Sequence, residues 1–319
     1  MIEVVPSLFD TNHSSSSHLL QNKIFTATGL TVIEVSGQDA PKFLQGQLTC
    51  NVNDLSESQA SIAAFCNAKG RVISTLVVVK IQQSFLLILP ISLLDTVIKK
   101  LGMYVLRAQV KLHDQTDKCQ LLGLQALPNQ VNEFDWPTAD FAVGHHPAML
   151  VKLPSTPRYL LVADPTQAQE LIAHLRERQG FETGDLDEWR YQDISSALPW
   201  FDMDQTEQHI PQMLNLDQLG GISFNKGCYT GQEIVARSHY LGKVKRALFV
   251  AECHQPGTFD HGCAVLDSNN LQNLGCVLAA RTWAGVTRLL LVLQIVDGQP
   301  KNLILDDDHR TPLAIISDY

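Results

Sequence analysis

The chain has 319 residues, 45% hydrophobic and 18% charged, which is long enough for two or three globular domains. Its formal net charge of -9 argues against stable nucleic-acid binding, which normally requires a basic surface. The longest apolar runs are far shorter than the roughly 20 residues of a membrane helix. The opening MIEVVPSLFD lacks the cationic and apolar regions of a signal peptide. We therefore expect a cytoplasmic protein without membrane contact.

The N-terminal half begins with a serine-rich stretch, residues 11–18, which has no apolar periodicity and is expected to be a flexible tail. A strand is predicted from Leu30 (LTVIEVSG), followed by a short helix capped by Asp39. The runs RVISTLVVVKI and FLLILP, joined by a turn around Gln82 to Ser84, predict a hairpin.

A helix is expected to start at Ser92 and to stop at Gly102, with YVLRAQVKL returning as a strand. The same order then recurs, because AMLVKL and RYLLVAD predict a second hairpin and Asp164 with Pro165 opens a second helix. Two hairpin-then-helix units indicate an α+β protein with two ferredoxin-like domains.

The pattern changes after about Lys243. Short β-rich runs such as ALFVAEC and RLLLVLQIV alternate with turn residues and show no helical period. This region, 243–319, is expected to be a separate C-terminal β-barrel, and residues 1–242 are expected to form the two-domain region.

The stretch NKGCYTGQEIVAR (225–237) carries the strongest chemical signal. Thr230 and Glu233 have the spacing of a capping box, which predicts a helix from Gly231 to Gly242. Cys228 would then lie just before a helix N-terminus, with Lys226 two residues away, and both influences favour a thiolate. Cysteine is also a common small core residue and capping boxes are frequent, so a purely structural Cys228 stays open.

The same stretch resembles a family signature. KGCYTGQEIVAR is similar to the motif of the YgfZ family, which is related to the glycine-cleavage T protein, an aminomethyltransferase. The blocks SGQDAPKFLQGQLTCNV, CNAKGRVIS, IPQMLNLDQLGGISF and GKVKRAL resemble other parts of the family pattern, in the same order. The T-protein branch lacks the cysteine, so Cys228 places the chain with YgfZ.

The resemblance implies two ferredoxin-like domains and a β-barrel around a channel that holds tetrahydrofolate. It also implies a role in iron–sulfur cluster assembly or repair, with an indirect effect on tRNA modification (methylthiolation). The expected partners are iron–sulfur assembly proteins or cluster-containing enzymes.

Site residues are expected in two groups. Cys228 and Lys226 would be the reactive residues. The residues expected to contact folate are Trp189, Leu30, Arg71, Gly227, Tyr229 and Gln232. Trp189 would stack on the pterin, although a large aromatic residue equally often fills a core. Arg71 could bind a carboxylate, although most exposed arginines are only solvated.

Two other functions stay open. The chain could be a tetrahydrofolate-dependent aminomethyl- or methyltransferase, or a binding protein in which Cys228 has no chemistry. No metal site is expected, because the seven cysteines form no CxxC pair and the His and Cys residues between 253 and 276 lack metal-ligand spacing.

Overall fold

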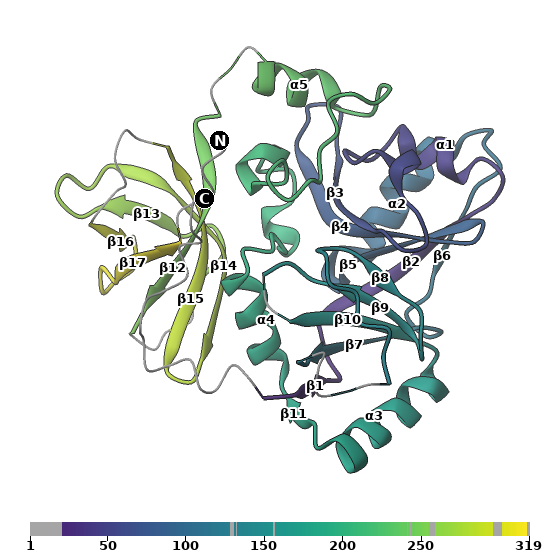
Figure 1. Ribbon diagram of the computed structural model, residues 1–319. Coiled ribbons are helices and arrows are strands. Elements are labelled where there is room, and N and C mark those ends of the chain that lie inside the picture. The colour runs from purple at the N-terminus through teal and green to yellow at the C-terminus, as the bar shows by residue number, and fades with distance from the viewer. Residues whose placement is uncertain are drawn as a thin grey trace, which may run out of the picture.

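The computed structural model describes residues 21–127, 131, 133–155, 157–240, 242, 244–254, 259–295 and 302–317. The serine-rich stretch 11–18 lies outside these residues. The described chain forms two open sheets and a closed barrel, with the barrel on one side of Figure 1 and the two sheets on the other. Helix α4 (Leu186–Ser195) lies between them.

The first sheet has the strand order β3-β4-β5-β2-β6. Its strands are β2 (Leu30–Ser36), β3 (Ser61–Cys66), β4 (Val72–Ile81), β5 (Ser84–Pro90) and β6 (Lys111–Asp114). The predicted hairpin is confirmed, since β4 and β5 pair antiparallel across the turn at Gln82. Strands β4 and β5 are buried along almost their whole length, because helix α2 (Leu94–Val105) covers one face of the sheet and the rest of the protein covers the other.

The second sheet has the order β11-β1-β7-β10-β9-β8. Its strands are β1 (Lys23–Phe25), β7 (Gln120–Gln125), β8 (Val143–Gly144), β9 (Met149–Lys152), β10 (Arg158–Ala163) and β11 (Glu182–Gly184). Helix α3 (Pro165–Gln179) begins as predicted, because the Asp164 carboxylate accepts from the backbone N–H groups of Thr166 and Gln167. Strand β1 was not expected, and it joins this sheet although it precedes the first sheet in the chain.

The barrel closes in the order β12-β15-β14-β13-β16-β17. Its strands are β12 (Arg246–Cys253), β13 (Ala264–Asp267), β14 (Asn273–Trp283), β15 (Val286–Gln294), β16 (Leu303–Leu305) and β17 (Pro312–Ser317). The predicted C-terminal barrel and the α+β class are therefore confirmed, and the two open sheets agree with two further domains. The boundary between residues 242 and 243 stays a prediction.

The connections between these units are short helices. They comprise α1 (Ala40–Gln45), α4 (Leu186–Ser195), α5 (Gln232–Tyr240) and the 3-10 turns Val52–Asp54, Ile91–Leu93, Met203–Gln205 and Pro211–Leu214. Helix α4 is buried around most of its circumference, because the second sheet packs on one side and the barrel on the other.

Three local predictions were wrong. The helix expected at Ser92 starts at Leu94 and continues past Gly102 to Val105, so the segment YVLRAQVKL begins inside a helix. The Ser92 hydroxyl instead donates to Asp202. Packing of Val97 and Leu101 against the first sheet stabilises this longer helix, since tertiary burial outweighs the propensity cost of one glycine.

The predicted caps of α1 and α5 also differ. The Asp39 carboxylate makes no cap bond to α1 and accepts instead from the Gln109 N–H, which ties α1 to the segment before β6. Helix α5 runs from Gln232 to Tyr240, and the Thr230 hydroxyl donates to Gln47 rather than serving the capping box. Long-range polar partners therefore replaced both local caps.

Candidate functional site

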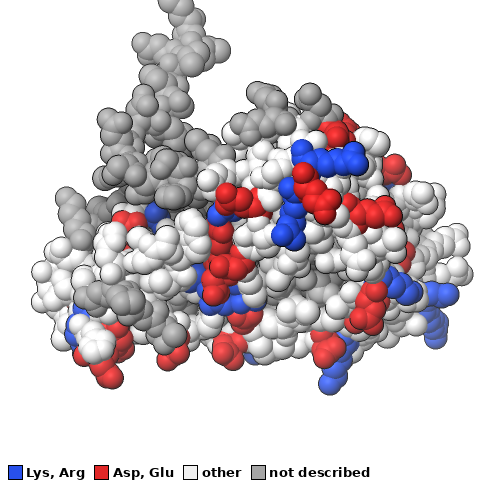
Figure 2. All heavy atoms as spheres, turned by 90° about the horizontal axis from the view of Figure 1, so that it is seen from below, with Lys and Arg blue, Asp and Glu red and all other residues white. Residues whose placement is uncertain are grey.

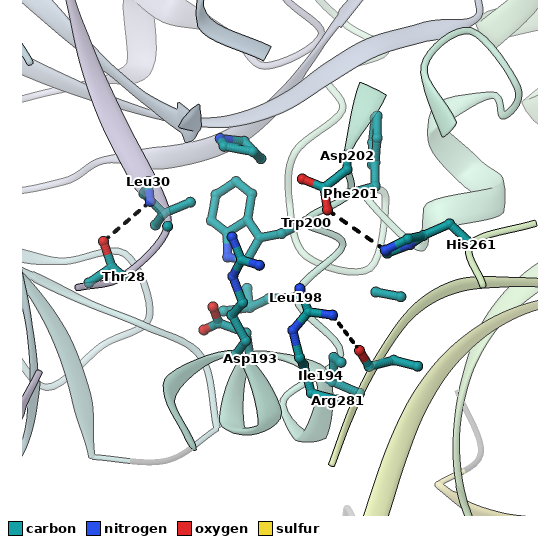
Figure 3. A pocket seen from close by; sticks show the side chains of 15 residues that line it. Thr28, Leu30, Asp193, Ile194, Leu198, Trp200, Phe201, Asp202, His261 and Arg281 are labelled. Carbon is teal, nitrogen blue, oxygen red and sulfur yellow. Dashed lines mark hydrogen bonds and ion pairs between the residues drawn. The ribbon is translucent and has the colours of Figure 1, made fainter. Parts of the chain in front are cut away.

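A cavity lies where the first sheet, α4 and the barrel meet. It has about 50 Å³ of free volume and is partly open to solvent. Its walls are Thr28, Gly29, Leu30, Pro90, Arg190, Asp193, Ile194, Leu198, Trp200, Phe201, Asp202, His261, Ala279, Ala280 and Arg281. Figure 3 shows that these side chains reach the cavity from separate parts of the fold.

The apolar part of the cavity comes from Leu30, Ile194, Leu198 and Phe201, with the Trp200 ring beside them. The indole Nε1 of Trp200 is buried and has no hydrogen-bond partner among the described residues. A buried N–H without a partner is costly, and this one belongs to a residue of the cavity wall.

One carboxylate of the cavity wall, that of Asp193, is held in place by a buried arginine. Asp193 pairs with Arg158, which is fully buried and lies over the Trp189 ring at 4.5 Å from its centroid. Burial raises the pKa of the Asp193 carboxyl, while the Arg158 guanidinium opposes that change. Asp193 therefore presents a fixed carboxyl group to the cavity.

A second carboxylate lies at the opposite wall. Asp202 accepts a hydrogen bond from the Ser92 hydroxyl at 2.7 Å, and its other oxygen is 3.7 Å from His261 Nε2. The His261 Nδ1 atom lies 2.9 Å from the Leu278 carbonyl oxygen, which accepts if that nitrogen carries the proton. Ser92, Asp202 and His261 thus form a polar chain from the end of the first sheet to the barrel.

Trp189 does not line the cavity. Its ring is fully buried against Phe25, at a centroid distance of 5.0 Å, and against Gly123, where a Cβ atom would lie 2.5 Å from the indole. Trp189 thus packs in the core of this structure, and its predicted contact with a folate stays a prediction. Leu30 lines the cavity, and Trp200 provides the aromatic wall.

The cysteine loop lies in a different place, beside α1 and β3. Lys226 donates to the backbone carbonyls of Leu48 at 2.8 Å and Cys50 at 2.7 Å. Burial lowers the pKa of the Lys226 ammonium to about 8. The Cys228 side chain, two residues on, is exposed. The structure therefore directs the Lys226 amine into the protein and the Cys228 thiol toward solvent.

The residues after Cys228 close the loop. Tyr229 is buried, its ring lies 5.0 Å from Lys226 Nζ, and burial raises the pKa of its hydroxyl. Gln232 accepts from the Tyr229 N–H at 3.3 Å, whereas Gly227 is exposed with open space around its Cα. These contacts order the loop without any involvement of the cavity.

Arg71 belongs to the surroundings of the loop. Its guanidinium donates to the Gln208 carbonyl at 2.7 Å. The turn that precedes Arg71 contacts the start of α5, where Gly70 and Gly231 pack so closely that a Cβ at Gly231 would not fit. Among the described residues, neither Arg71 nor any of residues 226–232 lines the cavity. The structure thus divides the predicted site into a cavity and a separate thiol loop.

Most cavity residues were missed by the sequence reasoning. Arg190, Asp193, Trp200 and Asp202 fall in one stretch rich in charged and aromatic side chains, and that clustering is a signal the sequence carries. Arg281 comes from a barrel strand with no distinguishing motif. Within the described ranges, no group of three or more His, Cys, Asp or Glu could hold a metal ion. The described part of the chain also contains no helix that could cross a membrane.

Comparison with known proteins first defines the class of fold. The chain matches the GCVT N-terminal domain over residues 19–127. The glycine cleavage system aminomethyltransferase T from Bartonella henselae has the same fold, with a TM-score of 0.76 over 94% of this chain and 86% of that chain. Only 14% of the residues are identical, so this likeness shows the fold alone, which is that of the aminomethyltransferase T proteins.

Sequence relatives then define the family. The tRNA-modifying protein YgfZ from Yersinia enterocolitica is 37% identical over 297 residues, covering 89% of this chain and 88% of the relative. The protein of the same name from Colwellia psychrerythraea is 32% identical and covers 83% of each chain. The chain belongs to the YgfZ family.

Proposed function

We propose that this protein binds a reduced folate in the central cavity and supports tRNA modification. The observation that carries the proposal is the cavity itself, which combines the unpartnered Nε1 donor of Trp200 with a carboxylate, Asp193, and an apolar wall. A pterin presents both acceptors and N–H donors at its edge, so this set of groups fits it. The role in tRNA modification is extended from the names of the two relatives.

The proposed route to tRNA is indirect. The net charge is negative, and on the face shown in Figure 2 the described acidic and basic side chains are interspersed. Such a surface favours protein partners over a direct grip on the tRNA backbone. We therefore propose that the protein acts on iron–sulfur cluster assembly or repair, and that the modification enzymes depending on those clusters are affected.

Cys228 is the proposed reactive group in this role. Its thiol is exposed, while Lys226 holds the loop against the first domain. An exposed thiol on an ordered loop can exchange with a partner thiol or ligate iron transiently. The cavity and the loop would then act as separate ligand and partner sites.

Binding of folate is tested by titration with tetrahydrofolate, followed by calorimetry, in the wild type and in Trp200→Phe and Trp136→Phe. Trp200→Phe keeps an aromatic ring and removes the Nε1 donor, so we expect roughly ten-fold weaker binding from the lost hydrogen bond. Trp136 donates to the Val131 carbonyl in the second domain and does not line the cavity, so its variant should bind like the wild type. Absence of saturable binding at millimolar ligand would exclude the proposal.

The role of Cys228 is tested in cells that lack their own YgfZ protein. We expect Cys228→Ser to lose support of an iron–sulfur-dependent tRNA-modifying enzyme, whereas Cys263→Ser, at a half-buried barrel position, should retain it. Equal thermal stability of the two variants would show that the loss is chemical. Full activity of Cys228→Ser would show that the loop has only a structural role.

A folate-dependent aminomethyl- or methyltransferase is the second candidate. It is favoured by one observation, the presence of two carboxyl groups, Asp193 and Asp202, in the cavity walls, because such chemistry needs a general acid near the folate nitrogens. Folate-dependent release of formaldehyde or ammonia from small amines, lost in Asp193→Asn or Asp202→Asn, would support the transferase.

A further inference from the structure

Two guanidinium groups lie in the walls of the central cavity. Arg190 comes from α4 and Arg281 from barrel strand β14, and both line the same space. They interact unfavourably: burial lowers the pKa of the Arg281 guanidinium, and the positive charge of Arg190 lowers it further. Like charges in a partly dehydrated site repel more strongly than they do in water.

The hydrogen-bonding capacity of both groups is incompletely used. Arg281 donates one bond, to the Ala280 carbonyl at 2.8 Å, while its buried Nε has no hydrogen-bond partner among the described residues. Asp187 is the acid nearest that nitrogen, but its oxygen is 3.8 Å away and its side chain is 69% exposed. A distance of 3.8 Å is too long for a hydrogen bond.

The Arg190 guanidinium has even fewer hydrogen-bond partners. It forms no hydrogen bond or ion pair with another described residue, and its charge acts through space on Asp193 and Arg281. Its guanidinium instead lies against Gly29, where a Cβ atom would approach the terminal nitrogen to 2.6 Å. Glycine at this position therefore leaves room for the Arg190 head at the cavity wall.

The acids of the cavity are engaged elsewhere. Asp193 pairs with the buried Arg158, and Asp202 accepts from Ser92 and faces His261. In the described part of the chain, neither Asp193 nor Asp202 forms an ion pair with Arg190 or Arg281, and the exposed Asp187 is the only carboxylate paired with either arginine. Protein carboxylates therefore compensate these two guanidinium groups only in part.

We infer that Arg190 and Arg281 form a carboxylate subsite, which binds the glutamyl end of a folate and selects folates over pterins that lack it. The inference rests on the proposed function, because it specifies which end of the ligand this part of the cavity takes. Two guanidinium groups can bind carboxylates through paired, charge-assisted N–H donors. A bound carboxylate would also relieve the repulsion between the two arginines and supply a partner for the Arg281 Nε.

The test uses three probes: tetrahydrofolate, a tetrahydropterin without the p-aminobenzoyl-glutamate portion, and p-aminobenzoyl-glutamate alone. Affinities are measured by calorimetry for the wild type, Arg190→Gln, Arg281→Gln and Arg281→Lys. Arg176→Gln is the matched control, because Arg176 is an exposed arginine on α3, away from the cavity.

We expect each glutamine variant to bind tetrahydrofolate at least about ten-fold more weakly, as for loss of a charge-assisted hydrogen bond. Both variants should also lose most binding of p-aminobenzoyl-glutamate, whereas their affinity for the tetrahydropterin should stay within about two-fold of wild type. Arg281→Lys should fall between wild type and Arg281→Gln, because it keeps the charge and loses the planar fork. The dependence of tetrahydrofolate affinity on salt should decrease in the glutamine variants.

Two results would overturn the subsite while leaving folate binding intact. One is unchanged tetrahydrofolate affinity in both glutamine variants, and the other is an equal loss for the tetrahydropterin and tetrahydrofolate. If the wild type binds none of the three probes, the proposed function fails together with the subsite.

Discussion

Lys226 Nζ lies 2.7 Å from the backbone carbonyl oxygen of Cys50, and this hydrogen bond ties the cysteine loop to the segment between α1 and β3. A second bond, to Leu48, uses another N–H of the same amine. A neutral amine still has two N–H donors, so both bonds survive deprotonation near the lowered pKa of about 8. The sequence predicted a further role for this lysine, support of the Cys228 thiolate, and that role stays a prediction.

Removing this connection should loosen the loop. In Lys226→Met, we expect amide hydrogen exchange at Tyr229 and Thr230 to become about 30-fold faster, because the two lost hydrogen bonds contribute about 1 kcal/mol each. Lys69→Met is the matched control, since Lys69 is an exposed lysine in the neighbouring turn. Unchanged exchange in Lys226→Met would show that the loop is held by other contacts.

Cys228 should be the cysteine that alkylating reagents modify first. It is exposed, whereas burial raises the pKa of Cys50 to about 12 and also raises the pKa values of Cys66 and Cys119. Because the thiolate is the reactive form, we expect one rapidly labelled thiol per native chain. Mass spectrometry after brief iodoacetamide treatment checks this: Cys228→Ser should remove the fast label and Cys119→Ser should not. Several thiols labelled at one rate would contradict the prediction.

His209 should make the fold sensitive to mild acid. Burial lowers the pKa of its imidazole from 6.5 to about 4, and the charges of Arg71 and Arg246 act in the same direction. Between these two pH values the unfolded chain binds a proton that the folded chain does not, so stability falls as the pH decreases from 6.5 toward 4. The loss is about 3 kcal/mol at most.

The measurement for His209 is the pH dependence of urea unfolding. The wild type should lose more stability than His209→Gln between pH 6.5 and 4, because the variant has no imidazole to protonate. His113→Gln is the control, since His113 is an exposed residue of β6. Equal slopes for the wild type and His209→Gln would refute the assignment.

Gly123 should tolerate no side chain. A Cβ there would lie 2.5 Å from the Trp189 ring, which is enclosed by Phe25 and Arg158 and cannot move aside. We expect Gly123→Ala to lower the free energy of unfolding by about 1–3 kcal/mol. Gly102→Ala, inside α2 with open space around it, should raise that free energy by about 0.5–1 kcal/mol. Chemical denaturation of both variants distinguishes the two effects.

Several elements could be predicted because their signals are local. The strands Val72–Ile81 and Ser84–Pro90 are continuous apolar runs joined by a short turn, and Asp164 caps its helix through N–H groups two and three residues away. The cysteine motif was equally visible, since a loop of that composition needs no distant partner to be recognised. In each case the residues that determine the structure are neighbours in the chain.

Other features depend on partners far away in the chain. Strand β1 pairs with β7 and with β11, and β11 lies more than a hundred residues downstream in the chain. Nothing near Lys23–Phe25 therefore indicates which sheet this strand joins. Trp189 is an aromatic residue of the type that often contacts ligands. It lies in the core, however, because α4 is enclosed on both sides.

The sequence by itself determined the class of fold, several of its strands and helices, and the family, since these follow from local periodicity and ordered motifs. Only the tertiary structure decided which residues surround the cavity, because Leu30, Arg190 and Arg281 approach one another through the packing of α4 between a sheet and the barrel. It also separated that cavity from the Cys228 loop. Such placements depend on long-range burial and charge compensation, and local sequence patterns do not encode them.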